Sequence, residues 1–289
     1  MTTTTSTYLA VNQNLSRYQS MIASEPAVKT ATAYYTANIG SVTSISQFVG
    51  NYRLLSYALQ AYGLGDQVNS KALVTKVLEG GVSSSKALAN NLSNPNWAKF
   101  AAAFDFVGSG AASISTTSAV KTTTTNYVEQ KLEISQGQQD PGVQLALYFQ
   151  RVAPTVGSAL GIMGDVNLLD VVQTIFNLPA ENGSTNVQAE ASEISKLMPL
   201  SELQNPKELT QLTERFTASY ELDYGSGGID AGSSLTVNSD GNTSTSTGNA
   251  ATSILSSVIS GNSSFTSSST ASYFNSALLA SVQNLSLGG

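Results

Sequence analysis

LLSYALQAYGL, at residues 54–64, is the stretch that indicates the fold, because it recurs in altered form as LLDVVQTIFNL at residues 168–178. Both stretches carry apolar residues at helical spacing, and aligning them places Gly63 on Asn177. Glycine and asparagine best tolerate the left-handed backbone that often ends a helix. The match therefore predicts two related helices with similar ends, and a weak internal duplication.

The duplication extends beyond these helices. Asn94-Pro95 matches Asn205-Pro206, and each pair places a capping asparagine before a proline at the first helical position. After one inserted residue, three apolar residues of the first copy fall on three of the second: Trp97, Phe100 and Phe104 on Leu209, Leu212 and Phe216. We expect two related helical units, near residues 45–106 and 160–221.

Apolar residues at helical spacing, interrupted by turn residues, run from Glu25 to about Tyr220. This pattern predicts a mainly α fold with an elongated helical body. We expect a first helical unit at 25–107, a Ser/Thr/Ala linker at 108–125 and a second helical unit at 126–222. Within the second unit, helices are expected to begin at Asn126 and at Asp140-Pro141. The aromatic residues at helical positions are interpreted as core: Tyr34, Tyr52, Tyr62, Trp97, Phe100 and Phe104.

The composition changes after Tyr224. Residues 223–270 are rich in Gly, Ser and Thr, and residues 271–289 regain the spacing of an amphipathic helix. In the Gly/Ser/Thr-rich segment, residues 235–237 and the turn dipeptide Asp240-Gly241 favour a short β-hairpin. Disorder is the alternative that this composition leaves open.

The ends of the chain carry very little charge. Arg17 is the only charged side chain within residues 1–24, and none follows Asp240. Charged residues make up 11% of the chain, where about 25% is typical. Such a surface has little electrostatic self-repulsion, which favours close packing against partners or other copies.

Both ends carry apolar residues in the 3-4-3-4 spacing of a coiled-coil seam. The candidate assembly contacts are Tyr8, Val11, Leu15, Tyr18 and Ile22 in the N-terminal seam and Phe274, Leu278 and Leu285 in the C-terminal seam. Two interpretations stay open: the seams pair between copies, or each packs on the core of its own chain. Residues 1–24, polar and Thr-rich without a signal peptide, are also typical of segments that direct flagellar type III export.

The residue types exclude much enzyme chemistry. The chain has no histidine and no cysteine, which rules out a Ser-His-Asp triad and zinc sites with imidazole or thiolate ligands. No phosphate-binding glycine-rich loop is present. We therefore predict no catalytic residue, no cofactor and no metal, and a protein that is not an enzyme.

Two classes of partner are also disfavoured. The net charge is -6 and the 13 Lys and Arg residues are scattered, whereas nucleic-acid binding requires clustered positive charge. No stretch approaches the roughly 20 apolar residues of a membrane-spanning helix. We expect neither nucleic-acid binding nor membrane insertion.

Two sets of carboxylates could in principle form an acid/base pair or a calcium site. Glu129 and Glu133 share a helix face, as an acid/base pair would, but Lys131 and the polar surroundings favour a solvated face. Asp230 and Asp240 have the oxygen ligands that Ca²⁺ prefers, yet their spacing fits turns better than a calcium loop.

A longer set of motifs resembles an uncharacterised helical family of alphaproteobacterial type. The motifs are EPAV at 25–28, YY at 34–35, NIG at 38–40, YRLLSYAL at 52–59, AYGLGD at 61–66, FDF at 104–106, GVQLALYF at 142–149 and RF at 215–216. The resemblance covers about residues 15–221. Members are often encoded among flagellar genes, so the resemblance implies a flagellum-associated role without any catalytic residue.

These observations together favour a non-enzymatic structural or assembly component of the bacterial flagellum. It would contact other copies of itself or flagellar proteins through its uncharged terminal helices, outside the cell on the flagellum or cell surface. The alternatives are a cytoplasmic chaperone or regulatory module for another flagellar protein, and a surface filament or adhesin subunit unrelated to motility.

Overall fold

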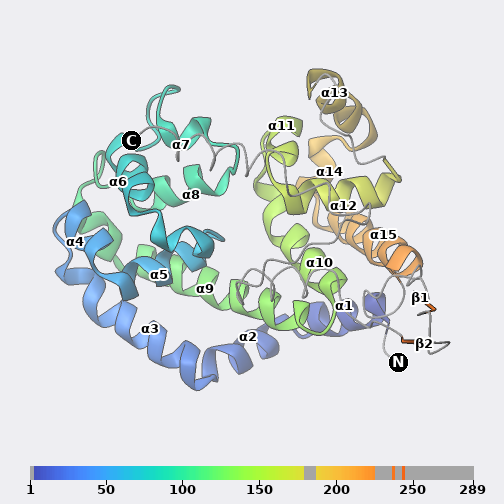
Figure 1. Ribbon diagram of the computed structural model, residues 1–289, viewed down its shortest axis with the longest axis horizontal. Coiled ribbons are helices and arrows are strands. Elements are labelled where there is room, and N and C mark those ends of the chain that lie inside the picture. Colours follow the sequence, from blue (N-terminus) through green and yellow to red (C-terminus); the bar gives the residue numbers. More distant parts are fainter. Residues whose placement is uncertain (1–2, 179–186, 225–235, 238–242, 245–289) are drawn as a thin grey trace. The chain divides into compact units, whose positions relative to one another are not determined.

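The computed structural model describes residues 3–178, 187–224, 236–237 and 243–244. Residues Met1–Thr247 form one compact unit, and a second unit, Gly248–Gly289, lies outside the described residues. The described chain is mainly helical, as the sequence predicts (Figure 1). None of its helices is long and apolar enough to cross a membrane.

The first half of the chain consists of helices joined by short turns. They are α1 (Thr4–Gln13), α2 (Leu15–Ser24), α3 (Pro26–Asn38), the 3₁₀ helix η1 (Ile39–Ser41), α4 (Ile45–Gly50), α5 (Tyr52–Ala61), the 3₁₀ helix η2 (Gly65–Asn69), α6 (Lys71–Gly80), α7 (Leu88–Asn91) and α8 (Asn96–Ala103).

The second half has a similar series. It contains η3 (Ala111–Ser115), α9 (Thr117–Gly137), α10 (Pro141–Val152), η4 (Ala153–Thr155), α11 (Ala159–Met163), α12 (Val166–Phe176), α13 (Val187–Leu197), α14 (Leu200–Gln204) and α15 (Pro206–Tyr224). Two strands of two residues, β1 (Thr236–Val237) and β2 (Thr243–Ser244), pair antiparallel. The turn expected at Asp240-Gly241 lies outside the described residues, so the hairpin stays a prediction.

The two halves repeat one order of elements. A single shift along the chain aligns α3, η1, α4 and α5 with α10, η4, α11 and α12. The same shift aligns the side chains that cap these helices. Ser44 and Ser158 cap α4 and α11, and Asn51 and Asp165 cap α5 and α12, each accepting hydrogen bonds from backbone N–H groups of the first turn.

The ends of α5 and α12 also match. Gly63 and Asn177 both have a left-handed backbone, with φ of 70° and 50°. The residue after each donates its N–H to a carbonyl five residues back, Leu64 to Leu59 at 2.8 Å and Leu178 to Gln173 at 2.9 Å. This is the Schellman arrangement of a helix C-terminus, and it confirms the left-handed end predicted for both helices.

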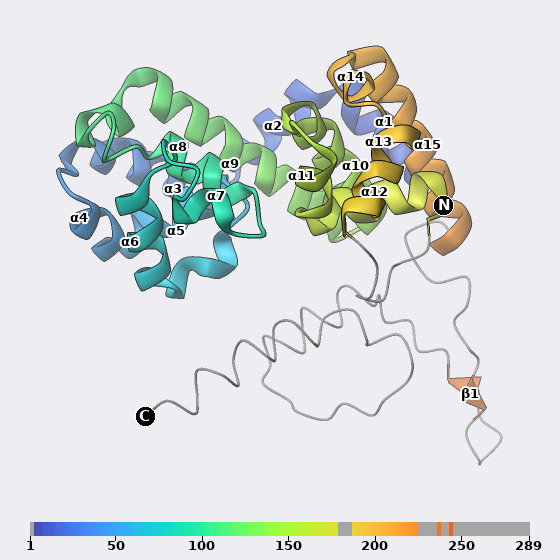
Figure 2. The same ribbon diagram turned by 90° about the horizontal axis from the view of Figure 1, so that it is seen from above.

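The duplication includes the first two helices. α1 and α2 precede α3 as α9 precedes α10. Neither α1 nor α9 stays within its own half: α1 packs on α10 and α15, and α9 packs on α5 as well as on α10. Figures 1 and 2 show α1 beside the second half. We call residues 4–103 the first repeat and residues 117–224 the second repeat.

Helix α9 begins earlier than expected. It starts at Thr117 rather than at Asn126, so much of the expected linker at 108–125 is helical. Thr116 caps it by accepting a hydrogen bond from the N–H of Ala119 at 3.2 Å. Threonine is a poor helix former, but Thr123 is buried in the packing of α9. Tertiary packing therefore outweighs the weak local propensity.

Aromatic side chains fill much of the interior. Phe48 and Phe104 stack at 4.9 Å, and Tyr57 stacks between Tyr35 and Tyr127, with ring centroids at 4.5 and 3.9 Å. Among the aromatic residues expected in the core, Trp97, Phe100 and Phe104 are buried and Tyr34 and Tyr62 are partly buried. Tyr52 is the exception, because 57% of it is exposed.

Candidate functional site

The N-terminal seam packs on its own chain. Tyr8, Val11 and Ile22 are buried in the core, Tyr18 packs partly buried against it, and Leu15 is 37% exposed. The seam is also broken by a turn at Asn14 between α1 and α2. Of the two interpretations left open by the sequence, the structure shows packing on the chain's own body. An assembly role for the buried residues would require α1 and α2 to leave that body.

The C-terminal seam residues Phe274, Leu278 and Leu285 lie outside the described residues. Asp230 and Asp240, considered above as calcium ligands, lie outside them as well. Assembly contacts through the C-terminus therefore stay a prediction.

Hydrogen bonds fix α1 to the second repeat. The hydroxyl of Thr4 donates to the carboxylate of Asp140 at 2.8 Å, and both side chains are buried. Asp140 also caps α10 by accepting from the N–H groups of Gly142 and Val143. The phenol of Tyr8 donates to Gln150 at 2.8 Å. These hydrogen bonds make the packing of α1 on the second repeat specific, in addition to its apolar contacts.

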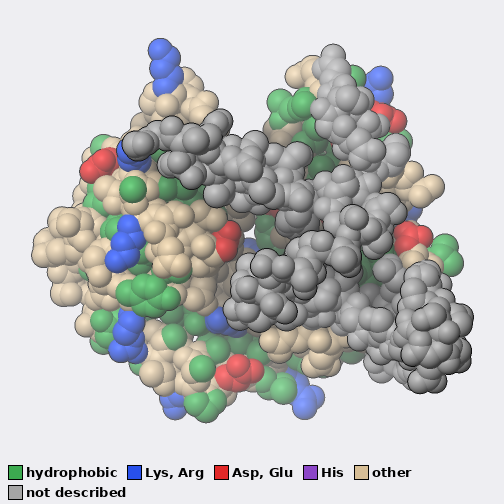
Figure 3. Space-filling view, viewed as in Figure 1, with side chains coloured by type: hydrophobic (Ala, Val, Ile, Leu, Met, Phe, Trp, Pro, Cys, Tyr) green, Lys and Arg blue, Asp and Glu red, His purple; other side chains and the backbone are tan. Residues whose placement is uncertain are grey.

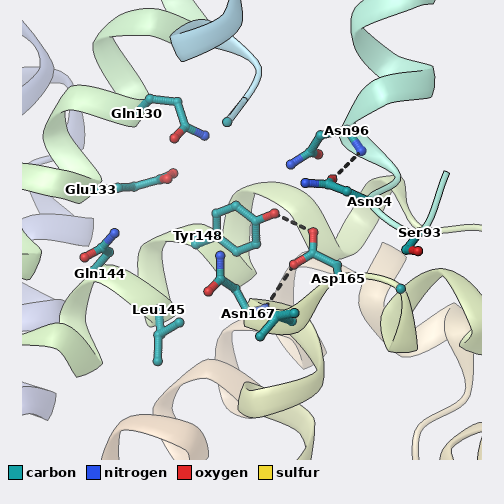
Figure 4. Close-up of a pocket in the computed structure, with 13 residues that line it drawn as sticks. Ser93, Asn94, Asn96, Gln130, Glu133, Gln144, Leu145, Tyr148, Asp165 and Asn167 are labelled. Atoms are coloured by element: carbon teal, nitrogen blue, oxygen red, sulfur yellow. Dashed lines mark hydrogen bonds between the residues drawn. The ribbon is translucent and has the colours of Figure 1, made fainter. Parts of the chain in front are cut away.

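A polar cavity of about 280 Å³ lies between the two repeats (Figure 4). The second repeat supplies side chains from α9, α10 and the start of α12. The first repeat supplies Gly63, just after α5, together with the start of α8 and the turn before it. Its lining side chains are mostly amides, hydroxyls and carboxylates: Ser93, Asn94, Asn96, Gln130, Glu133, Gln144, Tyr148, Asp165 and Asn167. Such a lining can hold a small polar group by hydrogen bonds.

Tyr148 and Asp165 form the centre of the cavity wall. The phenol of Tyr148 donates a hydrogen bond to the carboxylate of Asp165, and both residues are buried. Asp165 also accepts from the N–H groups of Asn167 and Leu168, each at 3.2 Å, and so caps α12. Burial, together with the neighbouring Asp165 carboxylate, raises the pKa of the Tyr148 phenol well above its usual value. Tyr148 is therefore a hydrogen-bond donor and not an acid at neutral pH.

Gly63 allows the first repeat to approach this wall. A Cβ atom at Gly63 would lie 3.1 Å from the amide nitrogen of Asn96 and 3.7 Å from that of Gln130. Asn96 is 8% exposed, and its N–H donates to the side-chain oxygen of Asn94 at 2.9 Å. The left-handed helix end thus serves both the turn and the close packing of side chains at the cavity.

Glu133 is buried, whereas the sequence favoured a solvated face. It is 4% exposed and accepts two hydrogen bonds from Arg151 of α10, at 2.6 and 3.0 Å. Glu129 lies 4.0 Å from the same guanidinium. Burial raises the pKa of Glu133, although the Arg151 charge opposes the shift. The solvated interpretation of Glu133 is wrong because Arg151, distant in sequence, is brought to α9 only by helix packing.

The carboxylates that line the cavity are engaged in internal bonds. Asp165 caps a helix and accepts from Tyr148, and Glu133 pairs with Arg151. Lys99 of α8 has a pKa lowered by burial, with the Asp165 charge opposing the shift, but it does not line the cavity. In the part of the chain that the structure describes, no group of three or more acidic residues could hold a metal ion. The arrangement joins helices of the second repeat rather than presenting a free acid/base pair.

Two comparisons with known proteins found a match. Residues 61–209 match the model of a family described as "Protein of unknown function (DUF1217)". A crystal structure of protein AGR_C_984 from Agrobacterium tumefaciens is 39% identical, with a TM-score of 0.70 over 75% of this chain and 92% of that chain. No curated protein matches the sequence. On both the sequence match and the shared fold, the chain belongs to the bacterial family of unknown function DUF1217.

Proposed function

We propose that this protein is a non-enzymatic component associated with the bacterial flagellum, and that it works by binding other proteins through its surface. The flagellar association rests on the resemblance to a family whose members are often encoded among flagellar genes. The binding role is carried by one observation: the carboxylates Asp165 and Glu133, which line the polar cavity, are bonded to other groups of the fold.

The surface supports a role in protein contacts. On the face seen in Figure 3, charged side chains are scattered between larger areas without charge. Only 11% of the residues are charged, so little repulsion opposes the approach of another protein surface.

In the first version of this proposal the protein is an exported structural subunit. Its assembly contacts would come from Leu15, which is exposed, and from Phe274, Leu278 and Leu285 near the C-terminus. Replacing Leu15 and Leu278 with Asp is expected to abolish assembly while the helical body stays folded, as circular dichroism would verify. Assembly at the level of the unchanged protein would contradict this version.

In the second version the protein is a cytoplasmic chaperone or regulatory module for another flagellar protein. The burial of Tyr8, Val11 and Ile22 favours this version, because a folded binding module keeps its N-terminal helices on its own body. The exposed surfaces of the body would then contact the partner, and export would not be needed.

Cell fractionation distinguishes the versions. Signal in sheared appendages, lost in a mutant without flagellar export, is expected for the subunit, and signal confined to the cytosol is expected for the module. Appendage signal that persists without flagellar export would instead indicate a surface filament or adhesin and contradict the flagellar association. A known filament subunit followed in the same fractions is the control for shearing and export.

A further inference from the structure

The two repeats carry cavities at equivalent positions. The shift that aligns the helix caps also aligns residues of the groove between α3 and α5 with residues of the polar cavity between the repeats. The aligned lining residues are Thr30 with Gln144, Ala31 with Leu145, Tyr34 with Tyr148, Tyr52 with Val166 and Arg53 with Asn167.

The equivalence includes a hydrogen bond. Tyr34 donates to the side-chain oxygen of Asn51 at 3.3 Å, as Tyr148 donates to Asp165, and it also accepts from the amide nitrogen of Asn51 at 3.1 Å. In both repeats, a tyrosine from the helix before the 3₁₀ turn thus bonds the cap of the second helix after it. Both repeats therefore retain the same local surface, formed by a tyrosine and the cap of a neighbouring helix.

Among the described residues, a loop of the other repeat covers only the second of these surfaces. Residues 93–96, which we call the covering loop, supply Ser93, Asn94 and Asn96 to the polar cavity of the second repeat. The groove of the first repeat, which we call the open groove, receives Tyr127 of α9 from the second repeat but no described residue of α12 to α15. Its volume is about 510 Å³ against about 280 Å³ for the covered cavity, and Tyr52 at its edge is 57% exposed.

The second repeat has its own copy of the covering loop. In residues 204–207, which we call the exposed loop, the N–H of Lys207 donates to the side-chain oxygen of Asn205 at 3.1 Å. The N–H of Asn96 donates to Asn94 in the same way at 2.9 Å. Asn96 is buried against the second repeat, whereas Asn205, Pro206 and Lys207 are exposed.

The loop contact between the repeats is consequently one-directional. Within the described residues, the covering loop of the first repeat enters the cavity of the second, whereas the exposed loop of the second does not enter the open groove, so this loop contact is not returned. A contact of this kind is heterologous, and repeating it between molecules produces rings or open filaments. Each chain has an open groove at one end of the series and an exposed loop at the other.

We propose that the open groove binds the exposed loop of a second copy of this chain, so that copies associate head to tail. The groove contributes the cationic Arg53 and the exposed ring of Tyr52, and exposed tyrosine is favoured at protein interfaces. Acidic residues flank the loop, Glu202 in α14 and Glu208 in α15. The loop also carries Lys207, so residues 202–208 hold two carboxylates and one cation, and their net negative charge complements Arg53. The inference deepens the proposed binding role but does not depend on a flagellar location.

Cysteine cross-linking tests the direction of the contact, because the chain has no native cysteine. Tyr52→Cys and Lys207→Cys are each made in the full chain, at positions equivalent to Val166 and Asn96, which share the covered cavity. After mixing in equal amounts and oxidation, the disulfide between the two variants is expected to exceed the sum of the two homodimer disulfides, which is the yield that random pairing would give. A mixed product no more abundant than that sum would overturn the proposal.

A second pair of variants tests the association without cross-links. Tyr52→Asp is expected to block the groove, and Gln204→Arg is expected to block the loop by facing Arg53 with a like charge. Light scattering should show masses above a dimer for the wild-type chain, monomers for each variant alone, and dimers for the mixture. Matching thermal melts would show that the variants stay folded.

Three results would contradict the head-to-tail contact: a monomeric wild-type chain, oligomers formed by either variant alone, or a mixture that stays monomeric. None of them bears on the fractionation experiment, which follows the location of the unchanged protein. A failure of this inference is therefore distinguishable from a failure of the proposed function.

Discussion

Tyr148 of α10 donates a hydrogen bond to Asp165, the residue that caps α12. This one bond joins two helices of the second repeat at the wall against which the first repeat packs. The equivalent bond of the first repeat, from Tyr34 to Asn51, is longer, at 3.3 Å, and lies at the open groove. Because the two bonds are equivalent, a substitution that removes one of them has a matched control at the equivalent position of the other repeat.

Replacing Tyr148 with Phe is expected to lower the free energy of unfolding by about 1.5–3 kcal/mol, the usual range for a hydrogen bond to a charged group. Tyr34→Phe should lose less, because Asn51 is neutral and Tyr34 is only partly buried. Urea denaturation at neutral pH measures both. Equal losses of unfolding free energy would show that the hydrogen bond to the Asp165 carboxylate stabilises the fold no more than the bond to the neutral Asn51 does.

Substitutions at the two left-handed helix ends are expected to change stability in opposite directions. Gly63→Ala is expected to destabilise the protein by roughly 1–2 kcal/mol from backbone conformation, with a further loss because the new Cβ would lie 3.1 Å from Asn96. Asn177→Gly should keep or raise stability, since φ there is 50°. Thermal melts of the two variants test this, and a stabilising Gly63→Ala would contradict the assigned backbone.

The buried Glu133 predicts a pH dependence of stability. Because burial raises its folded pKa above the ordinary value of about 4.3, its contribution is present below that ordinary value and is lost as pH rises through the folded pKa. The unfolding free energy of the wild type minus that of Glu133→Gln should therefore fall as pH rises from about 4.

Charged neighbours decide how steep the decline with pH is. Arg151 of α10 favours the ionised carboxylate of Glu133 and Glu129 of α9 disfavours it. Urea denaturation of the wild type and of Glu133→Gln at several pH values gives the difference. A difference that rises with pH would mean that the ion pair with Arg151 outweighs burial.

The N-terminal seam predicts unequal effects of one substitution at two neighbouring positions. Val11→Asp would bury an unpaired charge, so we expect a loss of several kcal/mol and release of α1 from α10 and α15. Leu15→Asp should cost far less, because Leu15 is 37% exposed while Val11 is 1% exposed. Limited proteolysis at the N-terminus and thermal melts report both effects. Similar stabilities for the two variants would mean that α1 does not pack on the helical body.

Helix ends were the part of the structure most open to prediction from sequence. The left-handed conformation at Gly63 and Asn177 follows from residue type, and Asn51 bonds to an N–H only three residues away. The same local rules failed at the start of α9, where the threonines at 122–125 resemble a linker. There the deciding contacts, such as Tyr127 on Tyr57, come from a distant helix.

The candidate site was not predicted, because its residues are far apart in the sequence. Glu133 and Arg151 come from neighbouring helices, and Asn96 comes from the other repeat. The one available signal was the duplication itself, since it aligns Tyr34 with Tyr148 and Asn51 with Asp165.

By itself the sequence determined the helical class, the duplication and the C-terminal ends of α5 and α12, because these depend on residue type and on hydrogen bonds between near neighbours. Only the tertiary structure decided that the N-terminal seam packs on its own body and that Glu133 is buried. It alone showed that the covering loop of the first repeat enters the cavity of the second, while no described loop enters the open groove. These outcomes depend on packing between segments far apart in the chain. Two repeats of similar sequence can therefore contact different neighbours.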